Sequence, residues 1–428
     1  MEITYDAVAG LQFGDEGKGK IVQTLSESGN YDLVARFSGG PNAGHTMYYK
    51  ETKVVTHVVP SGVLAGLPGF IGPGCVIDPV LLREEIEILL KLGLSVDFYV
   101  SELAHVITPY ERLIDLRMNK KLGTTGRGIG PTYANTSQRI GLRVKDVFHE
   151  ECQITLSDFW RELAETYRQD WINVEQEEER SWSEAIIWLM QHVKVAKREF
   201  FLSSGQAKNV FGKTNGTLRI LAEGAQAVML DPFYGTYPYV TSSHCVPSYI
   251  PIGLGLPGNA VKGEVYGVFK AYLTRVGAGP FLTEMEGDSS FGGDGERIRI
   301  AGQEFGSTTN RPRRVGWLDL VDLFDAIDLC GVTKLVMTKS DILKPENISG
   351  KVYVCHRHEH QSAGIKVPIY KKFEPWIQLE KVAYGENGNM THFGKFRDFV
   401  EKELGRKMDM ISTGPNVEDL IYLHKVKV

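Results

Sequence analysis

The sequence predicts an α/β fold: a single large domain on a central, mostly parallel twisted sheet covered by helices, with helical and loop insertions. The first observation is near the start of the chain, where residues 7–11 form a short apolar run typical of a buried strand. A glycine-rich turn follows, and an amphipathic helix begins near Lys18. Strand, glycine loop and helix in this order form the first part of a βαβ unit, which favours a parallel sheet.

Two later segments repeat this order. Residues 70–77 form a second strand and loop, after which Asp78 suits the N-cap and Pro79 the first position of a helix. Residues 317–330 repeat the scheme ahead of 335–337, a continuous apolar strand of the kind buried on both faces. The residues predicted to share one face of this third helix and to cap its end are Leu320, Phe324, Ile327 and Gly331.

One segment departs from the alternation of strands and helices. Residues 161–201 are helical in pattern and rich in charge and tryptophan, and the acidic run 175–180 is expected to be a solvated face. We therefore predict a peripheral helical insertion at about residues 150–205. The chain shows no internal repeat and no linker of the kind that separates domains, so we expect one domain over residues 1–428.

Composition excludes several classes of protein. Of the 428 residues, 42% are hydrophobic and 24% charged, the balance of a soluble globular protein. The net charge of -5 argues against nucleic-acid binding. The chain has no run of 18 consecutive apolar residues, the length needed to span a membrane. The acidic N-terminus lacks the features of a signal peptide. Five scattered cysteines suggest reduced thiols rather than a disulfide framework, so we expect a cytoplasmic protein.

The segment Gly14 to Lys20, with the sequence Gly-Asp-Glu-Gly-Lys-Gly-Lys, stands between the first strand and its helix. Its glycines would let backbone N–H groups approach phosphate oxygens at the start of the helix. The spacing is not that of a Walker A motif, and an acid here would repel phosphate unless it held a metal ion or acted as a base. A turn with charged surface residues is the structural alternative.

Two further loops carry groups suited to phosphate chemistry. Residues 39–46 place His45 in a small-residue turn after a strand, where a histidine can donate a proton to a leaving oxygen. Residues 123–131 combine hydroxyl groups, glycines and an arginine, and Arg139 follows; such groups together can hold a monophosphate. When each segment is considered alone, a structural role for His45 and a flexible surface loop at residues 123–131 are the alternatives.

Two segments in the second half suggest a carboxylate site and a base site. Residues 307–314 contain three arginines in four positions, which could clamp a small dicarboxylate, although a basic surface run is the alternative. Residues 338–341, Thr-Lys-Ser-Asp, follow the apolar strand directly. An aspartate there can accept hydrogen bonds from guanine N1–H and the 2-amino group, as in the [NT]KxD element of GTP-binding proteins; a polar turn is the alternative.

Taken together, these segments resemble the adenylosuccinate synthetase family. The resemblance runs from Ala7 to residues 411–415, in the family's order and at closely similar spacings. Further matching blocks are residues 223–226 (Glu-Gly-Ala-Gln), 235–243 and 274–280. The resemblance implies a single α/β domain with a P-loop-like GTP site, and a homodimer as the working unit.

The resemblance also implies the reaction, which is the GTP-dependent ligation of L-aspartate to C6 of IMP with Mg²⁺ as cofactor. Asp15 would remove the N1 proton of IMP, and O6 would then attack the γ-phosphate of GTP. The amine of aspartate displaces phosphate from the resulting 6-phosphoryl-IMP, giving adenylosuccinate, GDP and phosphate. This is the first committed step from IMP to AMP, and it depends mainly on positioning and charge stabilisation.

Matching residue by residue implies the site. The catalytic set is Asp15, His45, Lys18 and Gln226, and the metal ligands are Asp15 and the Gly44 carbonyl. The IMP-binding set is Asp15, Asn42, Thr125, Arg139, Gln226, Thr241 and Arg311, with Arg139 donated by the neighbouring subunit. The aspartate-binding set is Thr308, Thr309, Arg311 and Arg313. The GTP-binding set is Gly14, Glu16, Gly17, Lys18, Gly19, Lys20, Thr46, Arg313, Lys339, Asp341, Ser412 and Gly414.

Two features leave alternatives open. Residues 244–251 depart from the small-residue pattern common in the family, which is either neutral repacking or a change to the acceptor pocket. A paralogue that ligates aspartate to another purine nucleotide such as dGMP is therefore one alternative, and a non-catalytic GTP-binding protein is another. The presence of Asp15 favours IMP, because related enzymes that aminate a guanine nucleotide depart from this aspartate.

The segment 355–360, Cys-His-Arg-His-Glu-His, raises the possibility of a metal site, because alternate histidines share one face of a strand. No second ligand cluster has zinc spacing. We therefore expect this tract to be solvated surface.

Overall fold

The computed structural model describes residues 2–50, 52–149, 161, 174–213, 216–285, 293–306, 311–361, 365–377 and 390–423. Its centre is a ten-stranded sheet in which neighbouring strands are parallel, except that the edge strand β18 runs antiparallel to β17. In spatial order the strands are β18 (Leu420–Tyr422), β17 (Met410–Ser412), β14 (Lys334–Thr338), β11 (Val261–Lys270), β1 (Glu2–Gly10), β10 (Thr217–Glu223), β2 (Leu33–Arg36), β5 (Gly69–Ile71), β7 (Phe98–Ser101) and β9 (Lys194–Ala196). The predicted α/β class with a mostly parallel sheet is confirmed.

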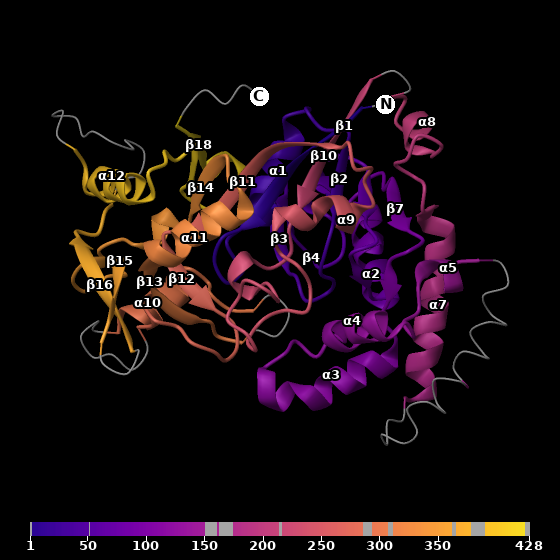
Figure 1. Ribbon diagram of the computed structural model, residues 1–428, viewed down its shortest axis with the longest axis horizontal. Helices are drawn as coiled ribbons and strands as arrows, with labels where there is room; N and C mark the ends of the chain where they lie inside the picture. Colours follow the sequence, from indigo (N-terminus) through magenta and orange to yellow (C-terminus); the bar gives the residue numbers. More distant parts are fainter. Residues whose placement is uncertain are drawn as a thin grey trace.

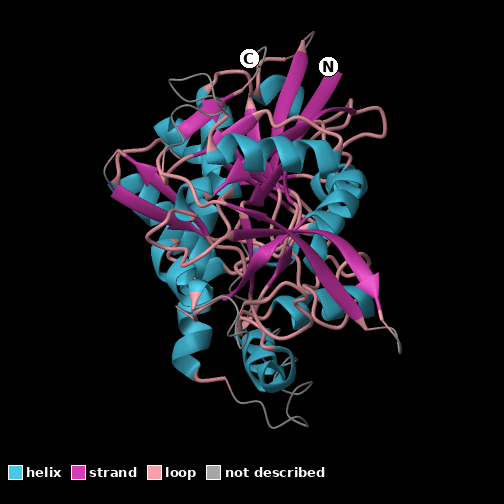
Figure 2. Cartoon of the chain, turned by 90° about the vertical axis from the view of Figure 1, so that its left-hand side faces the viewer, coloured by secondary structure: helices cyan, strands magenta, loops and turns pink. Residues whose placement is uncertain are grey.

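Helices cover both faces of this sheet (Figures 1 and 2). The helices are α1 (Lys18–Glu27), α2 (Pro79–Lys91), α3 (Pro109–Leu122), α4 (Ile129–Gln138), α5 (Val144–Val147), α7 (Gln176–His192), α8 (Ala207–Val210), α9 (Ile250–Leu254), α10 (Asp294–Ala301), α11 (Leu320–Cys330) and α12 (His392–Leu404). Alternate side chains of each central strand enter two separate cores, as the two-residue period of a strand requires. One core includes α1, α2 and α7, and the other includes α9, α11 and α12.

A second sheet lies beside the central one and contains β12 (Tyr272–Arg275), β13 (Arg314–Asp319), β15 (Val352–His360) and β16 (Lys366–Phe373) in that order. Two short pairs complete the strands, β3 (His45–Tyr49) with β4 (Thr52–Thr56), and β6 (Val76–Ile77) with β8 (His105–Val106). Because the central sheet takes strands from both ends of the chain, we infer that the described residues form one domain; the bounds 1–428 stay a prediction.

The predicted helix starts agree with the structure where the signal is local. The Asp78 carboxylate accepts from the backbone N–H of Val80 (3.1 Å) and Leu81 (3.3 Å) at the start of α2. Gly331 ends α11 in the left-handed conformation. One side chain was misplaced, because Phe324 is 46% exposed while Leu323 is fully buried. In a helix with 3.6 residues per turn, both Leu323 and Phe324 can share a face with Leu320 and Ile327. In this structure the face that packs against the core includes Leu323 instead of Phe324.

The predicted insertion at about residues 150–205 lies partly outside the described residues. Its described part contains α7, which packs against α2, and β9, which extends the edge of the central sheet. The acidic run at the start of α7 is largely exposed, as expected of a solvated face.

The prediction for residues 355–360 needs correction. The tract lies on β15, but a β-bulge between Cys355 and Arg357 breaks the two-residue alternation of side chains. His356 therefore contacts Phe399 of α12, whereas the His358 side chain is only 7% exposed and pairs with Asp319. The tract is not simply solvated surface.

Among the described residues, no helix is long and apolar enough to cross a membrane. Cys75, Cys245, Cys330 and Cys355 are buried free thiols.

Candidate active site

The segments singled out in the sequence converge on one edge of the central sheet. The six parallel neighbours β2, β10, β1, β11, β14 and β17 end at Arg36, Glu223, Gly10, Lys270, Thr338 and Ser412. Ligands of open α/β sheets bind at the carboxyl ends of the strands. The segments that follow these ends carry Asp15, His45, Gln226, Asp341 and Gly414, with His45 as the first residue of β3, so the chain topology brings these predicted residues to one edge.

The glycine loop between β1 and α1 is organised around a buried acid. Glu16 is fully buried and accepts from the backbone N–H of Gln12 (3.2 Å) and of Gly14 (2.8 Å) and from Lys18 Nζ (2.7 Å). Gly17 caps α1 in the left-handed conformation and offers no side-chain acceptor. Glu16 therefore holds the loop and balances Lys18 in this structure, while the first N–H groups of α1 remain suited to an anion.

Asp15, the predicted base, is paired with the predicted aspartate clamp. Arg313 Nε donates to Asp15 Oδ2 at 2.7 Å, although the two residues are 298 positions apart. The Arg313 side chain is 8% exposed and that of Asp15 34%. Loss of hydration raises the pKa of Asp15, but the positive charges of Arg313, Lys270 and Lys18 outweigh this and leave it below its usual value. Asp15 is therefore a carboxylate at neutral pH.

His45 is held by a buried carboxylate that the sequence analysis did not single out. At the end of β10, Glu223 contacts His45 Nδ1 and accepts from Ser61 N and Ser61 Oγ, both at 2.7 Å. Gly19 permits this packing, because a Cβ at that position would lie 3.0 Å from His45 Cβ. The contact with Glu223 fixes the ring and leaves Nε2 as the other functional nitrogen.

The charges around this pair favour an ionised Glu223. Burial lowers the pKa of His45, and the positive charges of Arg36 and Lys18 act in the same direction against the effect of Glu223. Burial acts to raise the pKa of Glu223, but His45, Arg36 and Ser61 together lower it. Negative phosphate groups near His45 would favour its protonated form.

Asn42, Thr241 and Gln226 present polar groups at the same edge. Asn42 Nδ2 donates to Thr241 Oγ1 at 3.2 Å, which joins two residues predicted to bind IMP. Gln226 Oε1 is buried without a hydrogen-bond partner, as is Thr124 Oγ1 beside the predicted residue Thr125. Buried polar atoms are rarely left unpaired, so these two atoms are suited to a bound ligand.

The predicted aspartate loop meets the loop at residues 123–126. Arg311 Nη1 would lie 3.4 Å from a Cβ at Gly123, which places the two segments against each other. Thr125 is half-buried and Arg311 is exposed. Thr308 and Thr309 lie outside the described residues.

The predicted guanine pocket is formed by β14, β17 and their loops. Asp341 follows β14 in the short turn η5 (Ser340–Ile342), where Ser340 Oγ donates to Ser412 O at 2.8 Å. Lys20 Nζ donates to Ser412 Oγ and Gly414 O, both at 2.9 Å, and so ties the glycine loop to this pocket. Burial lowers the pKa of Lys20 to about 8 against the effect of nearby acids. Burial also raises the pKa of Asp341.

Backbone strain is concentrated at the predicted site. Among the described residues, six other than glycine have a positive φ, namely Asp15, Lys50, Arg139, Gln226, Gln303 and Lys339. Four of the six were predicted as site residues. Such conformations cost of order 1–3 kcal/mol each and cluster where function requires a fixed geometry.

Five predicted residues are exposed in this chain, namely Asp15, Gly17, Thr46, Arg139 and Arg311. Arg139 stands at the C-cap of α4, and Thr46 lies on β3. Gly44 precedes β3 and is half-buried. By contrast, the altered segment 244–251 is mostly interior: Cys245, Val246, Pro247 and Ile250 are buried, while His244 packs between Phe233 and Tyr249.

Sequence reasoning also missed a buried basic residue. Lys270 at the end of β11 is fully buried, and its Nζ contacts Thr274 Oγ1 and lies 3.2 Å from Glu304 Oε2. Its charge lowers the pKa of Asp15. Both Lys270 and Glu223 are charged residues that end an apolar strand, which is the signal that could have identified them.

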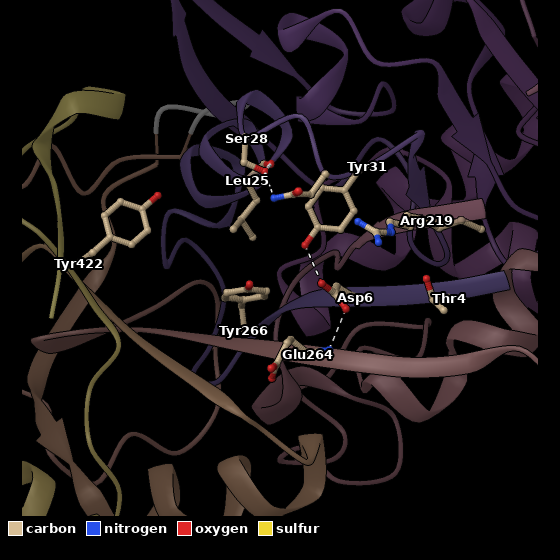
Figure 3. Close-up of a pocket in the computed structure, with 11 residues that line it drawn as sticks. Thr4, Asp6, Leu25, Ser28, Tyr31, Arg219, Glu264, Tyr266 and Tyr422 are labelled. Carbon is tan, nitrogen blue, oxygen red and sulfur yellow. Dashed lines mark hydrogen bonds between the residues drawn. The ribbon is translucent and has the colours of Figure 1, made fainter. Parts of the chain in front are cut away.

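The cavity in Figure 3 is separate from this site. It has a volume of about 400 Å³ and is lined by residues such as Asp6, Tyr31, Glu264 and Tyr266, none of which belongs to the predicted set. Asp6 and Glu264 precede the carboxyl ends of β1 and β11 by several residues.

Comparisons with known proteins give the family of the chain. A family model described as adenylosuccinate synthetase matches residues 7–421. The adenylosuccinate synthetase of Thermotoga maritima is 40% identical over 426 residues, covering 97% of this chain and 98% of the relative. That of Porphyromonas gingivalis is also 40% identical, with the same shares covered.

Solved structures give the same result. The fully ligated adenylosuccinate synthetase from Plasmodium falciparum superposes with a TM-score of 0.83 at 32% identity, covering 98% of this chain and 99% of that one. A succinoaminodeoxyadenylate synthetase of cyanophage S-2L, solved with dGMP and with dATP as an energy donor, gives a TM-score of 0.65 at 20% identity, covering 99% and 96%. The latter shares the fold. The chain belongs to the adenylosuccinate synthetase family and is accordingly a ligase of purine nucleotide biosynthesis.

Proposed function

We propose that the chain ligates L-aspartate to C6 of IMP at the expense of GTP, giving adenylosuccinate, GDP and phosphate. The observation that carries the proposal is the Asp15–Arg313 pair, which joins the nucleotide loop to the arginine loop at 2.7 Å. A base for the purine ring and a cation for the incoming dicarboxylate thus lie within one site.

The reaction proceeds in two displacements. Asp15, an ionised carboxylate, accepts the N1 proton of IMP, and the negative charge that develops on O6 makes this oxygen a nucleophile. The bond from O6 to the γ-phosphorus forms as the bond to the β-phosphate oxygen breaks, which releases GDP. The neutral amine of aspartate then attacks C6, inorganic phosphate departs with O6, and the nitrogen gives one proton to solvent and keeps the other in adenylosuccinate.

Several side chains stabilise the charge that moves during these steps. His45, oriented by Glu223, contacts the transferring phosphoryl group, and Lys18 balances its charge from the start of α1. Gln226 and Asn42 donate hydrogen bonds from their side-chain amide N–H groups to the 6-oxyanion, and the unpaired Gln226 Oε1 can accept from another group of the substrate. Interactions with charge that develops only in the transition state accelerate the reaction most.

The remaining predicted residues bind the ends of the substrates. Thr125, Thr241 and Arg139 hold the IMP phosphate, and Arg311 and Arg313 hold the aspartate carboxylates. Lys339, Asp341 and the loop from Ser412 to Gly414 bind guanine.

We also propose Mg²⁺ as the cofactor. The Asp15 carboxylate and the Gly44 carbonyl would hold it, and both supply the oxygen ligands that this hard cation prefers. The Asp15 side chain fits this role because it is partly exposed and only its Oδ2 atom is paired with Arg313. Its Oδ1 atom would be the ligand of the ion. When bound, Mg²⁺ neutralises charge on the phosphate oxygens.

We further propose a homodimer in which Arg139 of each subunit enters the neighbour's site. Arg139 is exposed and adjoins Ile140, a large apolar side chain that is 56% exposed. Phe233 and Tyr237 are 78% and 81% exposed. Exposed apolar side chains of this size favour burial against a second copy.

The shared site can be tested by mixing two inactive variants. Arg139→Leu and Asp15→Asn homodimers are each expected to be inactive. Heterodimers contain one site with both defects and one with neither, so mixed samples should regain up to roughly a quarter of wild-type activity after random exchange. Subunit exchange is checked by mass spectrometry of differently tagged chains. Exchange without any recovered turnover would contradict a site shared between subunits.

The aspartate clamp gives a second prediction. Arg313→Leu should raise KM for aspartate at least about tenfold, because a charge-assisted contact of roughly 1.5–3 kcal/mol is lost. KM for GTP should change little, and kcat should fall because Asp15 loses its partner. Steady-state kinetics with each substrate varied in turn provide the measurement. Equal increases in KM for aspartate and GTP would show that Arg313 only maintains the loop.

The acceptor nucleotide is tested directly by phosphate release with IMP, dGMP or no acceptor, each with GTP, Mg²⁺ and aspartate. Of these three samples, we expect only the one that contains IMP to release phosphate. Release with dGMP would support the paralogue, and an inert protein would support a GTP-binding role. The interior position of residues 245–247 supports repacking over a new acceptor pocket.

We propose a cytoplasmic location, supported by the four buried free thiols.

A further inference from the structure

A group of three metal-ligating side chains lies outside the proposed active site. Among the described residues, Asp319, Cys355 and His358 form the one such group, and their ligand atoms all lie within 4.8 Å of one another. Asp319 ends β13 and begins α11, and the other two residues belong to β15. Asp319 is six positions after Arg313, which immediately precedes β13, or about 20 Å away at 3.3 Å per strand residue, so this group is separate from the catalytic edge.

The fold brings these residues together through strand register and a bulge. β13 and β15 are parallel neighbours, and Asp319 is directly paired with Cys355. The bulge at His356 interrupts the alternation along β15, so that Cys355 and His358 point to the same side although they are three residues apart. His356 is directed to Phe399 and Glu403 of α12 instead. Bulges of this kind commonly redirect a side chain at a functional site.

The carboxylate is held in place by the helix that follows it. Asp319 Oδ1 accepts from the backbone N–H of Val321 (3.0 Å) and Asp322 (3.5 Å), which leaves Oδ2 to face His358 Nε2 at 2.8 Å. The Asp319 and His358 side chains are 1% and 7% exposed. Cys355 is fully buried, and its thiol makes a long contact of 3.5 Å with Arg357 O. A ligand oriented by a second hydrogen bond is the usual arrangement in metal sites.

We propose that Asp319, Cys355 and His358 bind a divalent transition-metal ion of the zinc type. Thiolate, imidazole and carboxylate together suit Zn²⁺ or Co²⁺, whereas Mg²⁺ prefers oxygen ligands alone. On binding, the Cys355 thiol gives its proton to solvent. The hydrogen between His358 Nε2 and Asp319 Oδ2 also leaves to solvent, so that Nε2 presents a lone pair with the ring protonated at Nδ1, and Asp319 presents Oδ2. The ion joins β13, α11 and β15, and so stabilises the second sheet.

The test uses the full chain, stripped with a chelator and titrated with Zn²⁺ or Co²⁺ without nucleotide. We expect one Zn²⁺ per chain by elemental analysis, a rise in Tm with Zn²⁺, and a thiolate-to-cobalt charge-transfer band with Co²⁺. Cys355→Ser should abolish the band, and His358→Gln should weaken Zn²⁺ binding at least tenfold. Asp319→Asn should also weaken binding while keeping the helix cap, because asparagine caps as well as aspartate.

The matched control is His356→Gln, which changes a histidine of the same tract on the other side of the bulge and should leave binding unchanged. Absence of stoichiometric Zn²⁺ binding to the folded wild type would overturn the proposal. Binding that survives in both Cys355→Ser and His358→Gln would overturn it as well. Metal content and Tm are read without turnover, so these results do not depend on the ligase reaction.

Discussion

Asp15→Asn is expected to lower kcat at least about 10²-fold, the usual scale for the loss of a positioned proton-transfer group. An amide of the same shape cannot accept the N1 proton of IMP, so O6 would not become a nucleophile. An increase in KM for GTP would reflect the loss of a charged Mg²⁺ ligand, since the Glu16–Lys18 arrangement of the glycine loop does not depend on the Asp15 charge. The measurement is phosphate release at saturating GTP, IMP and aspartate.

Two further variants make this result specific. His45→Asn should cause a loss of similar size, because the ring positioned by Glu223 is removed. Asp97→Asn is the control, because it breaks an exposed ion pair with Lys194 (2.6 Å) that involves none of the predicted site residues. Exposed ion pairs contribute about 0–1 kcal/mol to the free energy of unfolding. It should leave kcat unchanged. Near-normal turnover in Asp15→Asn or His45→Asn would remove the role assigned to that residue.

The features that could be predicted from sequence are those that depend on residues adjacent in the chain. The N-cap of α2 by Asp78 and the C-cap of α11 by Gly331 depend on a few adjacent positions, and both are present. The parallel sheet follows from the order of strands and helices along the chain. The position of each site loop after a strand also follows, because carboxyl ends of parallel strands share an edge.

Features that depend on strand order in space could not be predicted in the same way. Glu223 is 178 positions from His45, and their contact requires β10 to lie between β1 and β2. The Asp15–Arg313 pair spans 298 positions. The direction of His358 depends on a bulge, which shifts the alternation by one residue and carries no glycine or proline to signal it. The prediction for Phe324 is wrong because helical spacing alone does not decide which of two adjacent residues, Leu323 or Phe324, lies on the buried face.

The guanine pocket permits a prediction that requires a gain as well as a loss. Asp341 sits in a turn held by two hydrogen bonds, from Ser340 Oγ to Ser412 O (2.8 Å) and from Trp376 Nε1 to Ser340 O (2.7 Å). Lys339 precedes it with a φ of 57°. A turn fixed in this way holds the carboxylate in one orientation, so an isosteric amide would change the hydrogen-bonding pattern and little else.

Asp341→Asn should weaken the use of GTP by about 3 kcal/mol or more, roughly 10²-fold in kcat/KM, because buried polar groups of guanine would lose their acceptor. Asparagine offers one acceptor and one donor, which matches xanthine, whose C2 carries an oxygen. The variant should therefore use XTP better than the wild type does. ATP, which has neither N1–H nor a 2-amino group, should serve neither protein well.

The control for this exchange is Glu346→Gln, which removes a charge from an exposed position of the same loop. It should leave the ratio of kcat/KM for GTP to that for XTP unchanged, which separates base recognition from the general effect of charge. The ratio should fall in Asp341→Asn alone. If that variant keeps full activity with GTP and gains none with XTP, residues 338–341 do not read the base. The choice of GTP as donor would then need another explanation, even if the ligation of aspartate stood, because Asp15 acts on IMP, His45 on the phosphoryl group and Arg313 on aspartate, and none of them on guanine.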